Sequence, residues 1–523
     1  MDSHYKAFIV VALVTVAVFA MARPIFLSWM SAEDFALRRN CWLAITAAAF
    51  LVPNFWLFMA LAAVIVVVAG HRDSNPAALY LFLLLVIPPL QADLPTFGVV
   101  KTLFPLQNFR LLSIVLLVPV ALRLYRENSL PAHRGGLSAG PRMVAADVFL
   151  FLFILLQLVL FTPYESGTNS IRRAFLIVLD VWLPYYVVSR ACRNRRMIVE
   201  AMSALALAAL ILAPLAIIET LRAWLLYGGL GDDWNIPNTL YLRRNDLLRA
   251  SVTAGHSIVL GYFFAVALGL WLYLQRQVPR GWAALGIAGL AIGVAATFSR
   301  GPWLGAVIAV LGYLALGPGA LQRSIKGLSL FAVIGAITLA TPLGGRIVGA
   351  LPFVGHIGSD TVTYREQLLR VSLQLIQQNP LFGSPLFLAQ MEELRTGEGI
   401  IDLVNAYATF ALSFGLVGLG LFVAFMGVIV VRTWRTVWAL SGVDPDSALI
   451  GASLLACLAS VLIMLATVSN YLSIPYVYLA LAALAAAYCH QAEHALLGDP
   501  AEPLVEHRVQ AARSGLAARS PPS

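Results

Sequence analysis

Residues 281–322 read GWAALGIAGLAIGVAATFSRGPWLGAVIAVLGYLALGPGALQ, and Arg300 is the one charged side chain in this stretch. The apolar runs on either side of it, 281–299 and 301–322, each have about the 20 residues of helix needed to cross a bilayer core about 30 Å thick. They predict two membrane-spanning helices joined by a short turn at Arg300.

The same pattern recurs along the chain. Uncharged runs cover residues 201–218, 404–431 and 448–489, and the last is long enough for two helices with a turn at Ser469-Asn470. Weaker candidates are 7–21, 41–52, 55–70, 77–94, 111–122, 144–161, 174–188, 252–274 and 328–340. We therefore expect an all-α, polytopic membrane bundle of about 12–15 transmembrane helices.

The composition supports this fold class. Hydrophobic residues make up 60% of the 523, whereas charged residues make up 12%, about half the share of an ordinary soluble domain. So little charge excludes a soluble enzyme, a disordered chain and a nucleic-acid-binding protein, although the net charge is +9. The four cysteines have no paired spacing, so no disulfide framework is expected.

Basic residues in alternate loops predict the orientation. If each run crosses once, the basic loops fall on one side, which the positive-inside rule makes cytoplasmic. These loops contain Arg123, Arg126, Arg134, Arg142, Arg190, Arg193, Arg195, Arg196, Arg276, Arg280, Arg323, Lys326, Arg432 and Arg435. The opposite, periplasmic side receives 162–173, 219–251 and the large loop 341–403, in which 364–378 predicts an amphipathic helix.

Three parts of the chain follow from this topology. Residues 1–197 are expected to form N-terminal transmembrane helices, 198–490 a transmembrane core that includes the loop 341–403, and 491–523 a cytoplasmic, disordered tail. The first run, 7–21, is interpreted as an uncleaved span, with a signal peptide as the alternative.

Arg300 is a candidate functional residue because an ionisable group at membrane depth is costly and basic residues are under-used on the non-cytoplasmic side. Arg249 and Arg365 also fall on that side. Arginine binds phosphate oxygens bidentately, so these three side chains suggest a site for a polyanion such as a lipid-linked diphosphate. If Arg249 and His256, seven residues apart, lay on a helix, they would share a face. No metal or cofactor motif accompanies them.

Three motifs resemble the O-antigen ligase and polymerase superfamily of bacterial envelope glycosyltransferases. They are Arg249-Ala-Ser-Val-Thr-Ala-Gly-His-Ser, Thr297-Phe-Ser-Arg-Gly-Pro-Trp, and Tyr364-Arg-Glu with Asn379-Pro-Leu-Phe-Gly383, followed by Asp402-Leu-Val-Asn-Ala-Tyr407 and Gly415-Leu-Val-Gly-Leu. The resemblance covers residues 198–488. It implies a GT-C-like helical bundle in the bacterial inner membrane, with its active site facing the periplasm.

The resemblance also implies an activity: inverting, metal-independent transfer of a glycan from undecaprenyl diphosphate to an acceptor glycan, without a cofactor. Arg249 and Arg300 would be catalytic, stabilising the leaving group, and Arg365, His256, Asn405 and Arg244 would bind substrate. Ligases of the family have His-Asn where this chain has Val404-Asn405. The general base is then open among Asp402, expected to be catalytic, Asp360, His256 and His356.

This departure favours a polymerase of exopolysaccharide or O-antigen repeat units over a ligase that transfers O-antigen to lipid A-core. A flippase for lipid-linked sugars is the alternative from another class, since it too would bind a diphosphate. The expected partners are the undecaprenyl-diphosphate-linked oligosaccharide, the acceptor glycan and the bilayer, with no nucleic acid. Whether a chain-length regulator also binds is left open.

Overall fold

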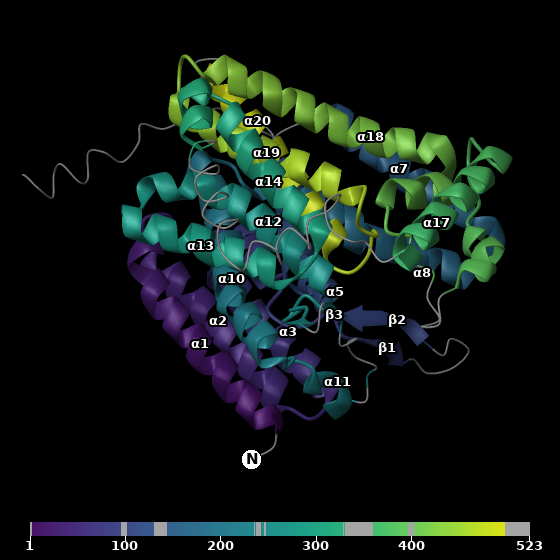
Figure 1. Cartoon of the computed structure of the whole chain (residues 1–523), viewed down its shortest axis with the longest axis horizontal. Coiled ribbons are helices and arrows are strands. Elements are labelled where there is room, and N and C mark those ends of the chain that lie inside the picture. Colours follow the sequence, from purple (N-terminus) through teal and green to yellow (C-terminus); the bar gives the residue numbers. More distant parts are fainter. Residues whose placement is uncertain are drawn as a thin grey trace, which may run out of the picture.

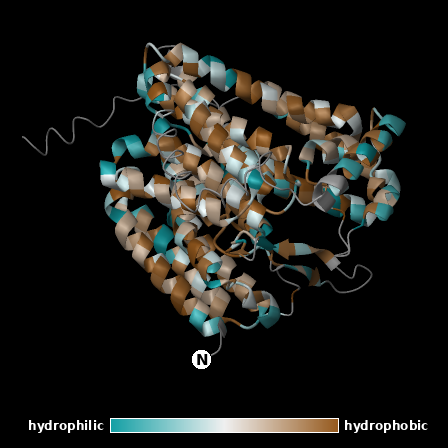
Figure 2. Cartoon of the chain, in the orientation of Figure 1, coloured by the Kyte–Doolittle hydropathy of each residue, from teal (hydrophilic) through white to brown (hydrophobic). Residues whose placement is uncertain are grey.

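The computed structural model describes residues 3–95, 102–129, 144–234, 236, 242–244, 247–327, 329, 359–395, 401 and 403–496. These residues form a bundle of helices with two short β-hairpins at one end (Figure 1). The long helices are hydrophobic over most of their length, and hydrophilic residues gather at their ends and in α17 (Ser359–Gln378) (Figure 2). The predicted all-α, polytopic membrane fold is confirmed.

The bundle is built from helices that mostly alternate in direction. In chain order they are α1 (Ser3–Phe26), α2 (Ala32–Leu51), α3 (Phe55–Arg72), α4 (Pro76–Leu83), α5 (Asn108–Leu112), α6 (Val118–Ser129), α7 (Val144–Phe161), α8 (Gly167–Ile177), α9 (Leu183–Ala191), α10 (Arg195–Arg222), α11 (Gly229–Asp233), α12 (Ser257–Leu274), α13 (Arg280–Ala296), α14 (Arg300–Ala315), α17, α18 (Ala406–Leu440), α19 (Pro445–Leu465) and α20 (Ile474–Leu496).

Short elements join or continue these helices. The π-helical turns η1 (Ser113–Leu117) and η3 (Val178–Trp182) link α5 to α6 and α8 to α9. The 3-10 turns are η2 (Thr162–Tyr164), η4 (Gln275–Gln277) and η5 (Phe387–Leu394). The hairpins are antiparallel pairs of β1 (Gln91–Pro95) with β2 (Thr102–Gln107) and of β3 (Arg243–Arg244) with β4 (Leu247–Leu248).

Within the described part of the chain, nine helical segments are long and apolar enough to cross a membrane. The helices α13 and α14 are apolar but shorter, with 17 and 16 residues. The candidate spans 144–161, 281–299 and 301–322 agree with α7, α13 and α14. The run 448–489 is divided into α19 and α20 as predicted, whereas the candidate 328–340 lies outside the described residues.

Two predicted spans were wrong in part. The run 77–94 forms only one helix of eight residues, α4, because the chain leaves the helix after Leu83 and enters β1. The run 41–52 is the second half of α2, which begins nine residues earlier, at Ala32. The first half of α2 is not an uncharged run, because it contains Glu33, Asp34, Arg38 and Arg39; of these, Arg38 is paired inside the protein.

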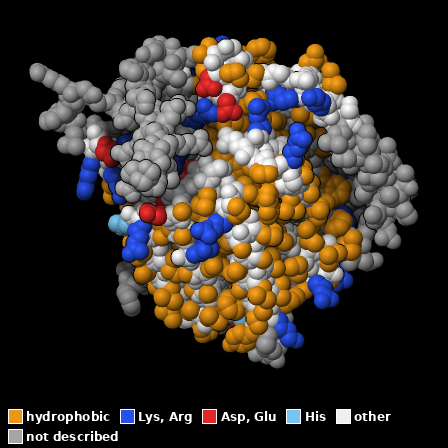
Figure 3. All heavy atoms as spheres, turned by 90° about the vertical axis from the view of Figure 1, so that its left-hand side faces the viewer, with side chains coloured by type: hydrophobic (Ala, Val, Ile, Leu, Met, Phe, Trp, Pro, Cys, Tyr) orange, Lys and Arg blue, Asp and Glu red, His pale blue; other side chains and the backbone are white. Residues whose placement is uncertain are grey.

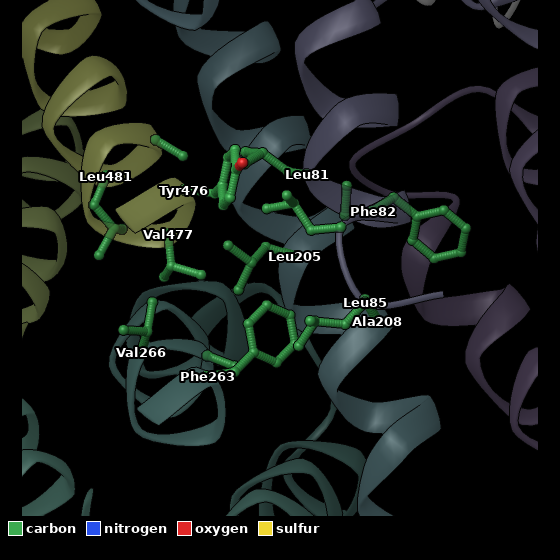
Figure 4. Close-up of a cluster of buried hydrophobic side chains, with 14 of the residues drawn as sticks. Leu81, Phe82, Leu85, Leu205, Ala208, Phe263, Val266, Tyr476, Val477 and Leu481 are labelled. Carbon is green, nitrogen blue, oxygen red and sulfur yellow. The ribbon is translucent and has the colours of Figure 1, made fainter. Parts of the chain in front are cut away.

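The centre of the bundle is formed by α4, α10, α12 and α20. Almost every residue of α12 is buried, and its Phe263 and Val266 face Leu205 and Ala208 of α10 and Val477 of α20 (Figure 4). Peripheral helices instead expose apolar side chains, among them Leu13 of α1 and Val64 of α3. On the face that includes α1 and α13, these side chains form a broad hydrophobic surface with Lys and Arg mostly toward its margins (Figure 3). A lipid-facing surface explains why they need no protein cover.

Ion pairs fasten one end of the bundle, which we call the basic end. Loops far apart in sequence meet there through Arg190–Asp147, Arg193–Glu127, Arg195–Asp446 and Arg432–Glu493. At the other end, the His4 ring lies 2.9 Å from the Asp233 carboxylate. Basic loops that were predicted to share a side of the membrane thus do lie together.

Arg38 has the most deeply buried ion pairs of the basic end. Its side chain is completely buried, with Nε donating to Asp73 Oδ2 at 2.8 Å and Nη2 donating to Glu200 Oε1 at 2.7 Å. Asn75 Nδ2 also donates to Glu200, at 3.3 Å. One guanidinium therefore joins α2, the end of α3 and the start of α10.

The described part of the large loop forms a small unit with its own apolar cluster. Leu368 of α17, Phe387 and Met391 of η5, and Leu412 of α18 are buried together. The amphipathic helix predicted at 364–378 is confirmed as the greater part of α17.

This loop is attached to α18 by main-chain atoms. Gly415 interrupts α18 at φ 67°, ψ −172°, and the freed N–H groups of Leu416 and Val417 donate to the carbonyls of Pro380 and Leu381. Ser384 N donates to Leu412 O at 2.7 Å. A Cβ at Gly415 would overlap the Leu381 carbonyl, and one at Gly383, φ 63°, would overlap α18. The loop motif that ends at Gly383 and the α18 motif that begins at Gly415 are separate in sequence, and they therefore meet at these two glycines.

We expect Gly415→Ala to loosen this attachment, because a β-carbon there costs about 1–3 kcal/mol of backbone strain and also overlaps the loop. Limited proteolysis of the purified protein should then cleave residues 380–395 faster than in wild type. Gly427→Ala is the matched control, because it lies in the same helix with open space around its Cα. Equal cleavage rates in the two variants would contradict the proposed attachment.

Arg38→Met should lower the free energy of unfolding by about 3–5 kcal/mol, because it leaves two buried carboxylates without their cation. Thermal melting of the detergent-purified protein measures this. Arg39→Met is the control, since the neighbouring side chain is partly exposed and, among the described residues, is hydrogen-bonded to Asn40 and forms no ion pair. The explanation fails if both variants melt alike.

Candidate functional site

The site is organised around the turn between α13 and α14. Thr297 Oγ1 donates to Val294 O at 2.7 Å, and Phe298 has a left-handed backbone with φ 46°, which is rare for a bulky residue. The turn ends at Ser299, and Arg300 is the first residue of α14. We call residues 297–300 the arginine turn.

Two more arginines reach the arginine turn from the segment before α12. Arg249 Nη2 donates to Ser299 Oγ at 2.9 Å and its Nε to Thr297 O at 3.3 Å. Arg244 Nη1 donates to Phe298 O at 2.7 Å. The structure thus brings three of the predicted site residues, Arg244, Arg249 and Arg300, to one turn.

Glu219, the last acidic residue of α10, fixes the segment that carries Arg249. Its wholly buried carboxylate accepts hydrogen bonds from the N–H groups of Leu226 at 2.9 Å, Ser251 at 3.0 Å and Val252 at 2.9 Å. Val252 has φ 42°, a strained backbone that these bonds maintain. Sequence analysis assigned Glu219 to a loop. A lone carboxylate at the end of a long apolar helix was the signal available for it.

His256 is not on a helix with Arg249. The residues between them form an extended segment and a turn, because Glu219 binds the N–H groups of Ser251 and Val252, and α12 begins only at Ser257. The interpretation of a shared helical face was therefore wrong.

His256 is the N-cap of α12, and its Nδ1 accepts a hydrogen bond from Ile258 N at 3.1 Å. Burial, aided by Arg249, lowers the pKa of His256 to about 4, so the ring is neutral at pH 7 with its proton on Nε2.

The turn between α19 and α20, residues 466–473, completes the site without any charged residue. A Cβ at Gly301 would overlap Thr467 Oγ1, so α14 and this turn are in close contact. Ser469 Oγ donates to Leu403 O at 3.0 Å, and the Tyr471 ring lies edge-on to His256 with centroids 5.7 Å apart. Sequence analysis predicted the turn at Ser469-Asn470 but no role for it.

Asn405 lies beside this turn at the start of α18. It is the N-cap of that helix, and its Oδ1 accepts hydrogen bonds from the N–H groups of Tyr407 and Ala408 at 3.0 and 3.1 Å. The side chains of the other site residues predicted in the large loop are not described by the structure. Arg365 and Asp360 lie on the backbone of α17 with side chains outside the described residues, and Asp402 and His356 lie outside them altogether.

The arginine turn carries positive charge that the described residues do not compensate. Among them, no carboxylate forms an ion pair with Arg249 or Arg300, and the buried Nε of Arg300 has no hydrogen-bond partner. Burial, with Arg244 nearby, lowers the pKa of Arg249 to about 10, which still leaves it charged at pH 7. An anion bound at the turn would relieve this excess.

The start of α14 adds a further anion-binding feature. Ser299 gives the helix no side-chain cap, because its Oγ donates to Thr297 O at 3.0 Å and accepts from Arg249. Free N–H groups at a helix N-terminus attract phosphate through both hydrogen bonding and the helix dipole. Two guanidiniums and a helix N-terminus therefore converge on one turn.

A family model matches part of this chain. Residues 285–423 match the family model described as O-Antigen ligase, a segment that includes Arg300, α17 and the kink at Gly415 but begins after Arg249. No curated protein sequence matches the chain. The family match confirms the resemblance that the motifs indicated: this chain is similar to the O-antigen ligase superfamily, whose members are ligase- or polymerase-type glycosyltransferases.

Proposed function

We propose that this protein is an inverting, metal-independent glycosyltransferase that polymerises lipid-linked repeat units at the periplasmic face of the bacterial inner membrane. The donor would be a glycan on undecaprenyl diphosphate, and the product an exopolysaccharide or O-antigen chain. The observation that carries this proposal is the uncompensated positive charge of the arginine turn, at the N-terminus of a membrane-embedded helix.

In this proposal the diphosphate binds between Arg249, Arg300 and the first N–H groups of α14. An acceptor hydroxyl oxygen attacks the anomeric carbon from the face opposite the diphosphate, forming the new glycosidic bond. The bond between that carbon and the diphosphate oxygen breaks, and its electron pair remains on the diphosphate. Preorganised guanidiniums stabilise that developing charge, which is the contribution a metal ion makes in other transferases.

The hydroxyl proton needs an acceptor. His256 is poorly suited to this role, because its Nδ1 already accepts the Ile258 N–H and its Nε2 carries a proton. That leaves Asp402, Asp360 and His356 of the large loop as the proposed bases, with Asp402 three residues before the Asn405 cap. The Val404 that replaces the family's histidine supports polymerisation rather than ligation to lipid A-core.

A flippase is the competing function. It would need its cationic groups along a path open to both sides, whereas Arg244, Arg249 and Arg300 all lie at the end of the bundle opposite the basic end. Purified protein with a lipid-linked repeat unit distinguishes the two. An enzyme releases undecaprenyl diphosphate and lengthens the glycan, and a flippase changes no covalent bond.

Arg300→Ala and Arg249→Ala should each reduce polymer formation by about 100-fold or more, the usual effect of removing a donor to a developing oxyanion. Their abundance in the membrane should not change. Arg280→Ala is the matched control, because Arg280 is exposed at the other end of α13, whose last residue adjoins the arginine turn. Normal long-chain polysaccharide from Arg300→Ala cells would refute the proposed function.

His256→Asn should retain most of the transfer activity at pH 7, since asparagine also caps helices and no proton transfer through His256 is proposed. It should also change the response of stability to acid. Between pH 6.5 and about 4 the unfolded histidine binds a proton and the folded one does not, so the wild-type free energy of unfolding falls as pH falls. Melting curves from pH 7.5 to 5 should show a steeper loss in wild type than in the variant. A 100-fold loss of activity would instead make His256 a base.

A further inference from the structure

A second polar region lies inside the bundle, separate from the arginine turn. It is a cavity of about 330 Å³ between β1, β2, α5, α7, η3, α18 and α20. None of the site residues predicted from the sequence lines it. Its volume is at the lower end of the range of small-ligand pockets, about 300–1,000 Å³.

The polar part of the cavity carries no net charge. Arg110 is neutralised by Asp180, with Nη2 donating to Oδ2 at 2.8 Å, and its Nη1 donates to Pro105 O at 2.6 Å. The other polar lining residues are neutral: the amides Gln91, Gln107, Gln157 and Asn470 and the phenols Tyr476 and Tyr478. A neutral polar ligand suits this lining better than an anion does, in contrast to the arginine turn.

The remaining wall is aromatic. Phe410 and Phe422 of α18 lie with ring centroids 4.7 Å apart, Phe153 of α7 lies 5.6 Å from Phe410, and Tyr478 of α20 lies 5.8 Å from Phe422. All four rings line the cavity. Aromatic faces beside amide groups match a pyranose ring, which has apolar C–H faces and a rim of hydroxyls that both donate and accept hydrogen bonds.

A hydrocarbon chain fits this lining less well. It would pack against the phenylalanines but would offer no hydrogen bond to the half-buried amides of Gln107 and Gln157. Within the described part of the chain, the Gln157 amide on α7 makes no hydrogen bond to protein, so it is available to a ligand.

The cavity and the arginine turn share one wall, the 466–473 turn. Asn470 and Leu472 line the cavity, while Tyr471 between them faces His256. Leu472 has φ 52°, and its Cδ1 would be 3.7 Å from a Cβ on Gly255. A molecule in the cavity would therefore lie directly across this turn from a diphosphate held by Arg249 and Arg300.

We propose that this cavity is a carbohydrate subsite that holds the acceptor glycan, across the 466–473 turn from the donor diphosphate. The identity of the bound sugar as acceptor rests on the proposed function. The existence of a neutral sugar site does not.

The test uses the full-length purified protein and two probes that cannot replace each other. A lipid-free oligosaccharide, released by mild acid from the envelope glycan of the producing cell, reports on the cavity. Inorganic diphosphate reports on the arginine turn. Saturation-transfer NMR follows the first and calorimetry the second.

Gln157→Leu should weaken oligosaccharide binding by about tenfold, the effect of losing one hydrogen bond to the ligand, and leave diphosphate binding unchanged. Arg300→Ala should do the reverse. Gln275→Leu, the same replacement at the basic end, should change neither. Phe422→Leu serves if Gln157→Leu does not fold, because it removes the stacking surface but retains an apolar wall suited to hydrocarbon.

The inference is overturned if the wild-type protein binds no oligosaccharide, or if Gln157→Leu or Phe422→Leu binds the oligosaccharide as tightly as wild type does. It is also overturned if a free polyprenol occupies the cavity and Gln157→Leu binds that polyprenol more tightly than wild type does. Unchanged diphosphate affinity in Arg300→Ala would refute the donor site instead, and the cavity result would still stand by itself. The two proposals therefore fail separately.

Discussion

A polar group surrounded by hydrocarbon must find its partner inside the protein, and this constraint explains most of the architecture. Arg38 meets it with two carboxylates, Arg110 with Asp180, and Glu219 with three backbone N–H groups. Each solution joins segments that are distant in sequence. The arginine turn differs, because within the described residues Arg249 and Arg300 have no carboxylate to meet. This uncompensated charge is the basis for the proposed anion site at the turn.

The same region concentrates backbone strain. Val252, Phe298 and Leu472 have positive φ values, and they lie on the three segments that surround the site. Such conformations cost about 1–3 kcal/mol each and persist only where neighbours hold them. Glu219 holds Val252, and Arg244 holds the Phe298 carbonyl. These contacts keep the arginines in place, as the proposed electrostatic stabilisation of a leaving group requires.

The fold class and the membrane helices around Arg300 could be predicted from sequence, because long uncharged runs have no other stable place than a bilayer. The predictions of spans failed in two places. The first half of α2 was not predicted as membrane-embedded, because Arg38 is charged and its partners Asp73 and Glu200 lie 35 and 162 residues away in sequence. Such distant pairing cannot be recognised from the local sequence. The run 77–94 looked like a span, yet its second part forms the wall of the site, where the Leu85 carbonyl accepts a hydrogen bond from Thr253.

For the site, the sequence identified the arginines but not their supports. Arg249 and Arg300 were visible because they depart from the positive-inside bias. Glu219, Ser299 and Tyr471 were not, because their importance depends only on which segments meet in three dimensions. The expected helix between Arg249 and His256 was wrong for the same reason, since Glu219 captures the N–H groups that a helix would have used.

The attachment of the large loop to α18 also bears on how such proteins could diversify. The loop is joined to the helix through main-chain N–H and carbonyl groups at Pro380, Leu381 and Ser384, two glycines allow the close approach, and Leu412 of α18 packs in the apolar cluster of the loop. A loop of different sequence can therefore be accommodated on the same helix, provided that Gly383, Gly415 and an apolar side chain facing Leu412 are kept. Recombination could therefore exchange the described part of the loop while leaving the arginine turn intact, so that the two regions evolve separately.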